Sequence, residues 1–329
     1  MRTENTPPPS PTDARLTGID AGRYLAAAAV ILLHAITSTV PRGVAPWSFV
    51  ELATRFAVPF FFLAGGYFLP PATTPLPRAL TRTFTRLVLP YLLWLLFYLA
   101  LLGKLETLAD PKRLIAVLAT GGDAYHLWFL PALGLGMAAT IILRRLLPPR
   151  ALLLVAVLAL AACLATSSYR ETLGIPGAPG RGGWPMGLSM VLAGHLMRDR
   201  RIRAGLGPAL AMVLAGYALT LIESALLHRA TGSAFGAQDF LMGTAPLGVG
   251  AFLLARSPAA NRLTGVARLG RISLGVYCIH VAVLLALLRL PPSPPTSLSV
   301  VVLAGATLLG STLACLLLAR VAALRRLIV

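Results

Sequence analysis

Charged residues are scarce in this chain. Only 12% of its 329 residues are charged, whereas 57% are hydrophobic and the mean hydropathy is +0.79. A soluble protein of this length needs far more polar residues to cover its surface. Several runs also reach the roughly 20 apolar residues that a membrane-spanning helix requires. The composition therefore excludes an ordinary soluble domain and predicts an all-α, multi-pass membrane protein, which we expect in the cell membrane.

Cysteines and acidic residues are also few. Cys163, Cys278 and Cys315 lie inside apolar runs without metal-ligand spacing, so we predict small buried hydrophobes, no disulfide framework and no metal site. The chain has 11 acidic residues against 29 Lys and Arg, a formal net charge of +18. In a soluble protein this excess would point to nucleic acid. Because the arginines stand in short loops between apolar runs, it indicates orientation in a membrane instead, and no nucleic-acid partner.

Hydropathy runs bounded by Pro, Gly and Arg clusters predict ten spans. They lie near residues 18–40, 49–69, 84–103, 126–147, 150–167, 184–197, 206–227, 239–255, 269–289 and 297–319. Segment 111–120 is too short to cross and is expected along the membrane interface. The polar, proline-rich residues 1–17 are expected to form a disordered cytoplasmic tail, and residues 320–329 a basic cytoplasmic end. One membrane domain, 18–319, accounts for the remainder.

The distribution of basic residues predicts the orientation of these spans. With the N-terminus in the cytoplasm, 20 of the 29 Lys and Arg residues fall on the cytoplasmic side and 8 on the other side. Arg55 lies within a span and completes the set. Loss or gain of one span would destroy this alternation. The positive-inside rule therefore favours ten helices with both termini cytoplasmic.

The first span, "RYLAAAAVILLHA" at 23–35, carries two ionisable residues. Eleven residues at about 100° each place Arg23 and His34 on one helix face, about 16 Å apart along the axis. The alanines at 26–29 allow a helix or a substrate to approach closely. Ionisable residues within a membrane are costly and are candidates for function. The alternative is an arginine that only anchors the helix and a histidine satisfied in the core.

Further polar residues lie in three other spans. Arg55 precedes Pro59 by one turn, and a proline opens a polar niche in a helix. Arg55 would bind a phosphate or carboxylate there, or extend to the outer surface. His126 beside Trp128 fits an interfacial aromatic belt or the rim of a polar cavity. Glu223 needs a polar partner or water.

Ser273, Tyr277 and His280 form one stripe of a helix, at spacings of four and three. Such a stripe holds a polar substrate or forms hydrogen bonds between helices. Taken together, the polar residues predict a cavity rich in arginine and histidine inside a helical bundle. The cytoplasmic arginines would lie near its entrance, and anionic ligands would suit it.

Six blocks of the chain resemble, in order, the membrane acyltransferase-3 family. They are "RYLAAAAVILLHA" at 23–35, "RFAVPFFFLAGGYFL" at 55–69, "RLVLPYLLWLLFY" at 86–98, "HLWFL" at 126–130, "ESALL" at 223–227 and "SLGVYCIH" at 273–280. The resemblance implies a ten-helix membrane enzyme that moves an acyl group, commonly acetyl, from cytoplasmic acyl-CoA to a hydroxyl. Acceptors in the family are usually sugars of cell-surface polysaccharides or lipid-linked glycans. Acyl-CoA is then a co-substrate, and no bound cofactor is implied.

The resemblance also implies roles for individual residues. The histidine of the family maps on His34 and its arginine on Arg23. The residues that match later blocks, with substrate-binding or supporting roles, are Arg55, His126, Trp128, Glu223, Tyr277 and His280. In one departure, Gly65 stands where relatives usually have serine. Any role of that serine is absent here or supplied elsewhere.

These roles lead to a mechanistic hypothesis. A neutral imidazole, with an ordinary pKa of about 6.5, can take the proton of an acceptor hydroxyl, which would make His34 the general base. Arg23 would bind phosphates of CoA. Arg55 and His280 would orient the acceptor or stabilise the oxyanion. A route through acyl-His34 stays open.

A transporter or flippase of a glycan or lipid-linked sugar is the alternative function. A polar cavity within the membrane would serve transport as well as catalysis. Transporters often carry internal repeats or broken helices in matched positions. No repeat is visible in this sequence, which favours the enzyme.

Overall fold

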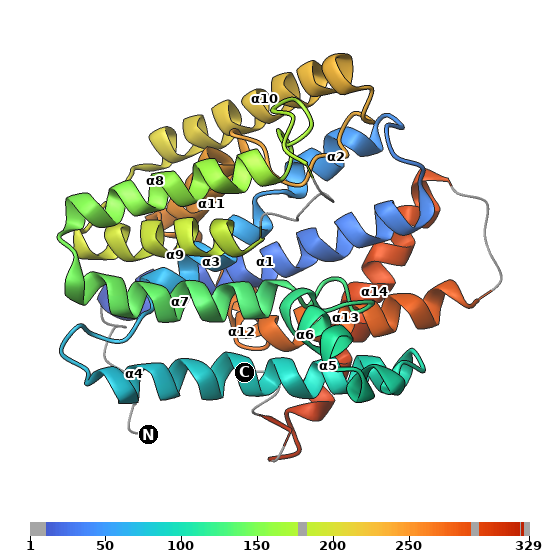
Figure 1. The fold of residues 1–329 in the computed structure, drawn as a ribbon, viewed down its shortest axis with the longest axis horizontal. Helices are drawn as coiled ribbons and strands as arrows, with labels where there is room; N and C mark the ends of the chain where they lie inside the picture. Colours follow the sequence, from blue (N-terminus) through green and yellow to red (C-terminus); the bar gives the residue numbers. More distant parts are fainter. Residues whose placement is uncertain (1–10, 177–182, 291–295, 323, 326–329) are drawn as a thin grey trace, which may run out of the picture.

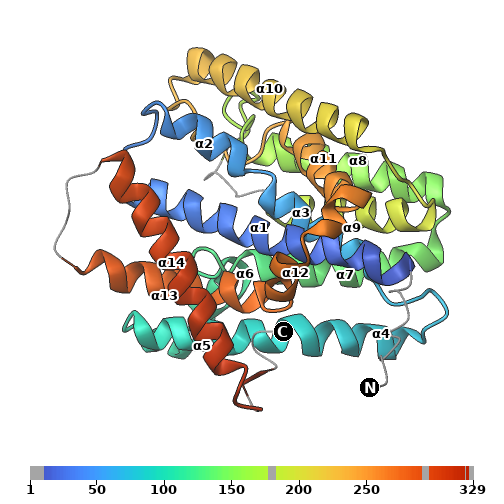
Figure 2. The ribbon, with the colours of Figure 1, turned by 180° about the vertical axis from the view of Figure 1, so that it is seen from behind.

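Helices make up the regular structure of the chain. The computed structural model describes residues 11–176, 183–290, 296–322 and 324–325, and this part of the chain contains no strand. Figures 1 and 2 show the longer helices running roughly side by side across the view. The α-helices are α1 (Pro11–Thr39), α2 (Trp47–Thr54), α3 (Ala57–Tyr67), α4 (Leu76–Thr83), α5 (Leu89–Leu101), α6 (Pro111–Thr120), α7 (Phe129–Leu146), α8 (Pro149–Thr166), α9 (Gly183–Asp199), α10 (Leu206–Thr231), α11 (Thr244–Ala255), α12 (Thr264–Gly270), α13 (Ser273–Leu288) and α14 (Ser297–Leu318). A π-helical turn, η1 (Phe84–Val88), joins α4 to α5, and two 3-10 helices are η2 (Leu105–Ala109) and η3 (Pro258–Arg262).

The helices confirm a multi-pass membrane protein. Within the described residues, seven helical segments are long and apolar enough to cross a membrane. They are Thr17–Thr39, Trp47–Tyr67, Leu76–Leu101, Phe129–Leu146, Pro149–Thr166, Leu206–Thr231 and Ser297–Leu318. The pair α12 and α13, bent by 72°, would make an eighth as one broken span. α9 and α11, at 17 and 12 residues, fall short of that length, so the ten-helix count and the placement of both termini stay predictions.

The ends of the chain leave two expectations open. α1 begins at Pro11, within the segment expected as a tail, while residues 1–10 lie outside the described residues. In the basic end at 320–329, residue 323 and residues 326–329 lie outside them as well. Segment 111–120 forms α6, a short helix with no buried residue, which agrees with its expected exclusion from the spans.

The second span is a broken helix. α2 ends at Thr54 and α3 begins at Ala57, so Arg55 lies at the break. Pro59 lacks an N–H and leaves the carbonyl of Arg55 without its usual helical donor, which explains the position of the break. The break directs the Arg55 side chain into the polar region described below.

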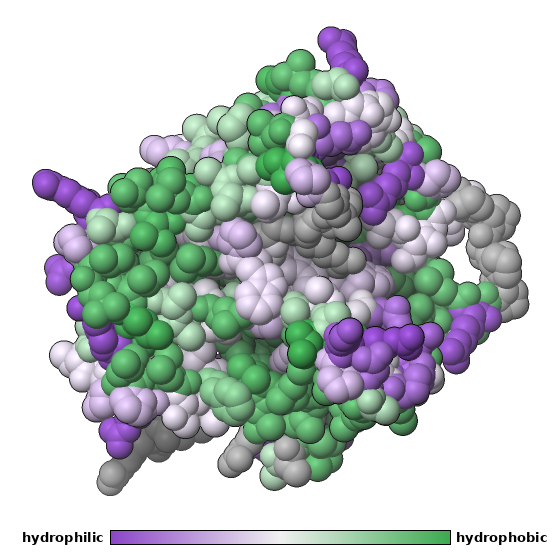
Figure 3. Space-filling model, in the orientation of Figure 1, coloured by the Kyte–Doolittle hydropathy of each residue, from purple (hydrophilic) through white to green (hydrophobic). Residues whose placement is uncertain are grey.

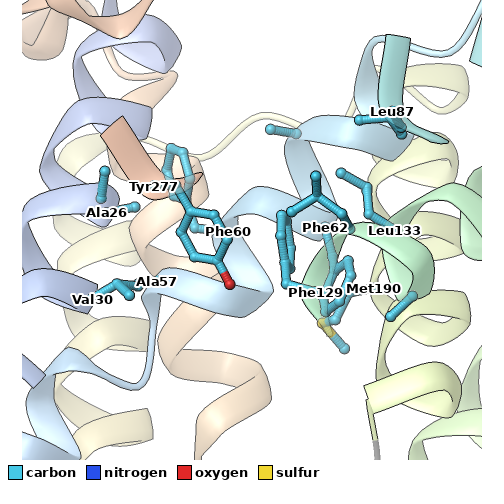
Figure 4. Packing of buried hydrophobic residues seen from close by; sticks show 14 of the residues in the cluster. Ala26, Val30, Ala57, Phe60, Phe62, Leu87, Phe129, Leu133, Met190 and Tyr277 are labelled. Carbon is cyan, nitrogen blue, oxygen red and sulfur yellow. The ribbon is translucent and has the colours of Figure 1, made fainter. Parts of the chain in front are cut away.

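α9 packs against α3, α7 and α8. Ten of its 17 residues are buried. The surrounding core is aromatic: the rings of Phe62 and Phe129 are 4.8 Å apart, and Figure 4 shows both beside Leu133. By contrast α8 buries only Leu152, Ala156 and Cys163. Broad hydrophobic areas of the surface (Figure 3) therefore belong to peripheral helices that would face lipid.

The three cysteines are free and buried, as the sequence predicts. Cys163 lies on α8, Cys278 on α13 and Cys315 on α14. Each is less than 1% exposed, so each acts as a small core residue.

Candidate active site

Three histidines from distant parts of the chain meet inside the bundle. His34 comes from α1, His126 from the turns before α7, and His280 from α13. The His34 and His280 rings stack with centroids 5.3 Å apart, and the His126 and His280 centroids are 5.1 Å apart. His126 is 1% exposed and His280 fully buried. This cluster pairs the first-span histidine with two later residues of the expected site.

Backbone carbonyls orient two of these rings. Nε2 of His126 is 3.0 Å from the carbonyl oxygen of Cys278, and Nδ1 of His280 is 2.5 Å from that of Tyr277. A carbonyl only accepts, so these nitrogens carry the protons in the neutral rings. The other nitrogens, Nδ1 of His126 and Nε2 of His280, have no hydrogen-bond partner within the described residues. Both are buried acceptors next to His34, which is unfavourable unless a polar ligand approaches.

A cavity of about 190 Å³, which we call the histidine cavity, adjoins this cluster. Its wall includes His34, Arg55, His126, Trp128 and Asp239. Arg55 forms ion pairs with Asp239, at 3.0 Å, and with Glu51, at 3.9 Å. Its buried Nε has no partner within the described residues and stays available as a donor. The wall thus offers a base, a cation and aromatic faces to a polar molecule.

A second cavity of about 480 Å³, the arginine cavity, lies at the other end of the same helices. Asp20 and Arg23 contribute from the N-terminal half of α1, whereas His34 and Thr37 line the histidine cavity further along α1. Three more guanidinium groups line it, from Arg82, Arg86 and Arg271.

Local breaks in the helices explain the position of these arginines. Arg86 lies in the π-helical turn η1, and such turns are frequent at functional sites. Arg271 lies at the bend between α12 and α13. Arg23 forms an ion pair with Asp20 at 3.4 Å and covers the ring of Phe68, 4.9 Å from its centroid. Four cations against one carboxylate make this cavity strongly positive.

Tyr277 lines both cavities. Its hydroxyl donates to the carbonyl of His126 at 2.5 Å, and its ring packs against those of Phe61 and Phe129. Phe61 and Phe129 line the arginine cavity. The rings of Phe61, Phe129 and Tyr277 therefore lie between the four arginines and the histidine cluster. The stripe on α13 therefore does both things that the sequence suggests: Tyr277 forms a hydrogen bond to another segment, and Ser273 and Tyr277 face a cavity.

Glu223 does not join the other expected residues. On α10 it accepts hydrogen bonds from the backbone N–H groups of Met242, at 2.9 Å, and Gly243, at 2.7 Å, and from the hydroxyl of Tyr169. It lines neither cavity. Its contacts anchor the segment that also carries Asp239, and only through that segment does it connect to the histidine cavity.

Sequence reasoning missed several residues of the two cavities. The sequence places Arg82, Arg86 and Arg271 only in the general set of cytoplasmic arginines near the cavity entrance and does not single them out. Arg82 and Arg86 are one turn apart and share a face, which is a signal that could have identified them. Asp239 and Tyr125 carried no signal, because a single acidic or aromatic residue in a loop is common. Only their approach to Arg55 and His34 reveals them.

The described residues that line the cavities are not grouped as a metal site. Within the described ranges, no three His, Cys, Asp or Glu side chains are arranged to hold a metal ion. The chemistry available from these residues is proton transfer by imidazole and charge stabilisation by guanidinium.

Gly65 lines the arginine cavity. A Cβ on Gly65 would lie 2.6 Å from Cδ1 of Leu133, so a larger side chain requires Leu133 to move. The glycine therefore enlarges the space beside Phe61 and Phe129.

Comparisons with known proteins give one match over most of the chain. A family model described as an acyltransferase domain matches residues 16–320. An amino-acid racemase of Enterococcus faecalis is 28% identical over 127 residues, which are 37% of this chain. This chain spans only 18% of the length of that relative. No solved structure matches the chain.

The domain match covers nearly every helix, from the first span to the last. It includes both cavities and all three clustered histidines. The chain therefore belongs to the membrane acyltransferase-3 family and is an acyltransferase.

Proposed function

We propose that this enzyme transfers an acyl group, in the first place acetyl, from cytoplasmic acyl-CoA to a hydroxyl of a cell-surface or lipid-linked glycan. One observation carries the proposal: an arginine-lined cavity and a histidine-lined cavity share Tyr277. An anionic donor and a hydroxylated acceptor could thus approach each other from the two ends of the bundle.

The arginine cavity is the proposed donor site. Guanidinium groups bind phosphates through paired, charge-assisted hydrogen bonds, and four of them line this cavity. It lies at the end of the bundle that the arginine distribution predicts to be cytoplasmic, where acyl-CoA is found. Its inner wall is formed by Phe61, Phe129 and Tyr277, which suits the apolar acyl end.

The histidine cavity is the proposed acceptor site. His34 takes the proton of the acceptor hydroxyl while the oxygen attacks the thioester carbonyl. The C–O bond forms, the C–S bond breaks, and the proton on His34 passes to the departing CoA sulfur. Arg55 offers its Nε–H to the developing oxyanion.

The proton positions assign His280 a narrower role. In its neutral form Nδ1 donates to the Tyr277 carbonyl, so Nε2 offers a lone pair. A lone pair does not stabilise an oxyanion. His280 is buried, lines neither cavity and stacks on the His34 ring. We therefore propose that His280 positions His34 and does not touch the acceptor.

The test is acyl transfer from labelled acyl-CoA to a glycan acceptor by purified protein in lipid nanodiscs. His34→Ala is expected to lower kcat by about 10²- to 10⁴-fold, as for loss of a general base. His195→Ala is the matched control, since His195 lines neither cavity. Full activity of a folded His34→Ala variant would overturn the assignment.

CoA release tests the remaining alternatives. An acyltransferase releases CoA when the acceptor is added, whereas a glycan transporter releases none. A stoichiometric burst of CoA without acceptor, lost in His34→Ala, would establish acyl-His34 as an intermediate.

A further inference from the structure

A third cavity lies outside both proposed substrate sites. It has a volume of about 270 Å³ and is lined by Tyr67, Arg198, Arg201, Arg203 and Arg256. It belongs to the end of the bundle where α3 and α9 end, the same end as the arginine cavity. The connection from α7 to α8, at the left of Figure 1, marks this end. The proposed transfer reaction uses none of these four arginines.

Two of the arginines are held in place by the protein itself. NH1 of Arg198 donates to the carbonyls of Tyr67, at 3.3 Å, and Leu69, at 2.6 Å. The guanidinium of Arg256 lies over the Tyr67 ring, 4.7 Å from its centroid, and its NH1 donates to the carbonyl of Ile202 at 2.5 Å. Three segments of the chain therefore converge to form a preorganised basic pocket.

The backbone at Arg201 is an independent indication of function. Arg201 has a φ of 52°, and no other non-glycine residue of the described chain has a positive φ. The N–H of Arg201 donates to Arg198 O and that of Ile202 to Met197 O, at 3.1 and 2.9 Å. This is the Schellman arrangement that ends a helix, and its left-handed position is usually a glycine. An arginine there is less favourable than glycine, which indicates a use for its side chain.

Among the residues that line the pocket, none is acidic. Within the described residues, Arg198, Arg201 and Arg203 form no ion pair with a carboxylate. Like charges gathered in one pocket repel each other, and an anion bound between them offsets this repulsion.

We propose that this pocket binds a phosphate group. Paired guanidinium N–H donors match phosphate oxygens, and basic pockets at the cytoplasmic membrane face recognise anionic head groups. Two sources offer that chemistry here, the head group of an anionic phospholipid and the nucleotide end of CoA. The second is within reach because Tyr67 of this pocket and Phe68 of the arginine cavity are consecutive residues.

Arg201, at the left-handed position of the Schellman motif, can be replaced without loss of stability. Arg201→Gly removes a cation and relieves the unfavourable backbone, so its Tm should equal or exceed that of wild type. Combined with Arg203→Gln, it removes two of the four charges. The matched control is Arg262→Gln with Arg268→Gln, which removes two exposed arginines that line no described cavity.

The experiment uses the full chain in two arms. In the first, nanodiscs contain phosphatidylcholine with phosphatidylglycerol, and native mass spectrometry measures retained phosphatidylglycerol. In the second, equilibrium dialysis measures binding of CoA and of 3′-dephospho-CoA. The double variant should lose at least fivefold in one arm, relative to the control.

Each outcome decides the proposal. Loss in the lipid arm identifies a head-group site. Loss of CoA affinity, absent for 3′-dephospho-CoA, identifies the nucleotide end. Binding within twofold of the control in both arms overturns the proposal and leaves the acyl-transfer proposal untouched.

Discussion

At the scale of single residues, Glu223 shows how a predicted site residue can act at a distance. The sequence predicts that a carboxylate within the membrane needs a polar partner or water. The partners are two backbone N–H groups and the Tyr169 hydroxyl, all from segments outside the helix of Glu223. The carboxylate therefore stabilises the loop that carries Asp239 and Phe240 into the histidine cavity.

Glu223→Gln should weaken this loop. The amide supplies one oxygen in place of two, so one of the N–H groups of Met242 and Gly243 loses its acceptor. A buried unsatisfied group costs about 1–3 kcal/mol of unfolding free energy. We expect a lower Tm and a raised KM for the acceptor, with a smaller effect on kcat, measured by thermal unfolding and steady-state kinetics. Unchanged stability together with an unchanged KM would contradict the role.

Tyr169 leads to a prediction on pH. Burial, and then the hydrogen bond to Glu223, raises the pKa of the Tyr169 hydroxyl above its usual value of 10.0. Because the pKa is raised in the folded state, the stabilisation that the Tyr169 hydroxyl provides is complete below about pH 10. It is lost as the pH rises above 10 through the pKa of the folded state. The stability difference between wild type and Tyr169→Phe should therefore shrink above pH 10 in denaturation curves. A difference constant to pH 12 would argue against it.

At the scale of elements, α9 packs more closely than its modest hydropathy indicates. A Cβ on Gly194 would lie 2.1 Å from the carbonyl oxygen of Leu63, and one on Gly66 1.9 Å from that of Val191. These glycines bring the backbones of α9 and α3 together, as small residues do between membrane helices. α9 is buried by α3, α7 and α8 and so needs less apolar surface than a helix that faces lipid.

Gly194→Ala should separate these two helices. The methyl group meets backbone, which cannot rotate away, and overpacking typically costs about 1–3 kcal/mol. Gly305→Ala on α14 is the matched control, because no atom lies within 4 Å of its Cβ position. Thermal unfolding in detergent should show a clear drop for the first variant and none for the second. Equal effects of both would contradict the close approach.

Breaks within spans were only partly predictable at this scale. Pro59 marked the niche at Arg55, and the structure divides the helix there. The bend of 72° between α12 and α13 had no comparable signal, since residues 269–289 read as one apolar run. That bend turns Arg271 into the arginine cavity. Because the bend has no signal in the sequence, the sequence does not identify Arg271 as a cavity residue.

At the scale of the whole molecule, the ten-span topology remains to be tested. It predicts that Ala72 and Arg200 lie in the cytoplasm, whereas Lys104 and Glu171 lie outside. Single cysteines at these exposed positions should react with an impermeant maleimide in intact cells only at Lys104→Cys and Glu171→Cys. The native cysteines are buried and supply a low background.

The pair Glu171→Cys and Arg200→Cys decides whether α9 crosses. Equal labelling of the two would show that α9 does not cross the membrane. Labelling of Ala72→Cys instead of Lys104→Cys would show that the orientation is the reverse of the predicted one.

The sequence by itself determined the membrane class, the positions of the helical segments and the common face of Arg23 and His34. These follow from local hydropathy and helical geometry. Only the tertiary structure decided which polar residues meet. It joined His126 and His280 to His34, surrounded Arg23 with further arginines and left Glu223 outside both cavities. The reason is that the lateral order of membrane helices depends on close packing and a few hydrogen bonds between segments far apart in the chain.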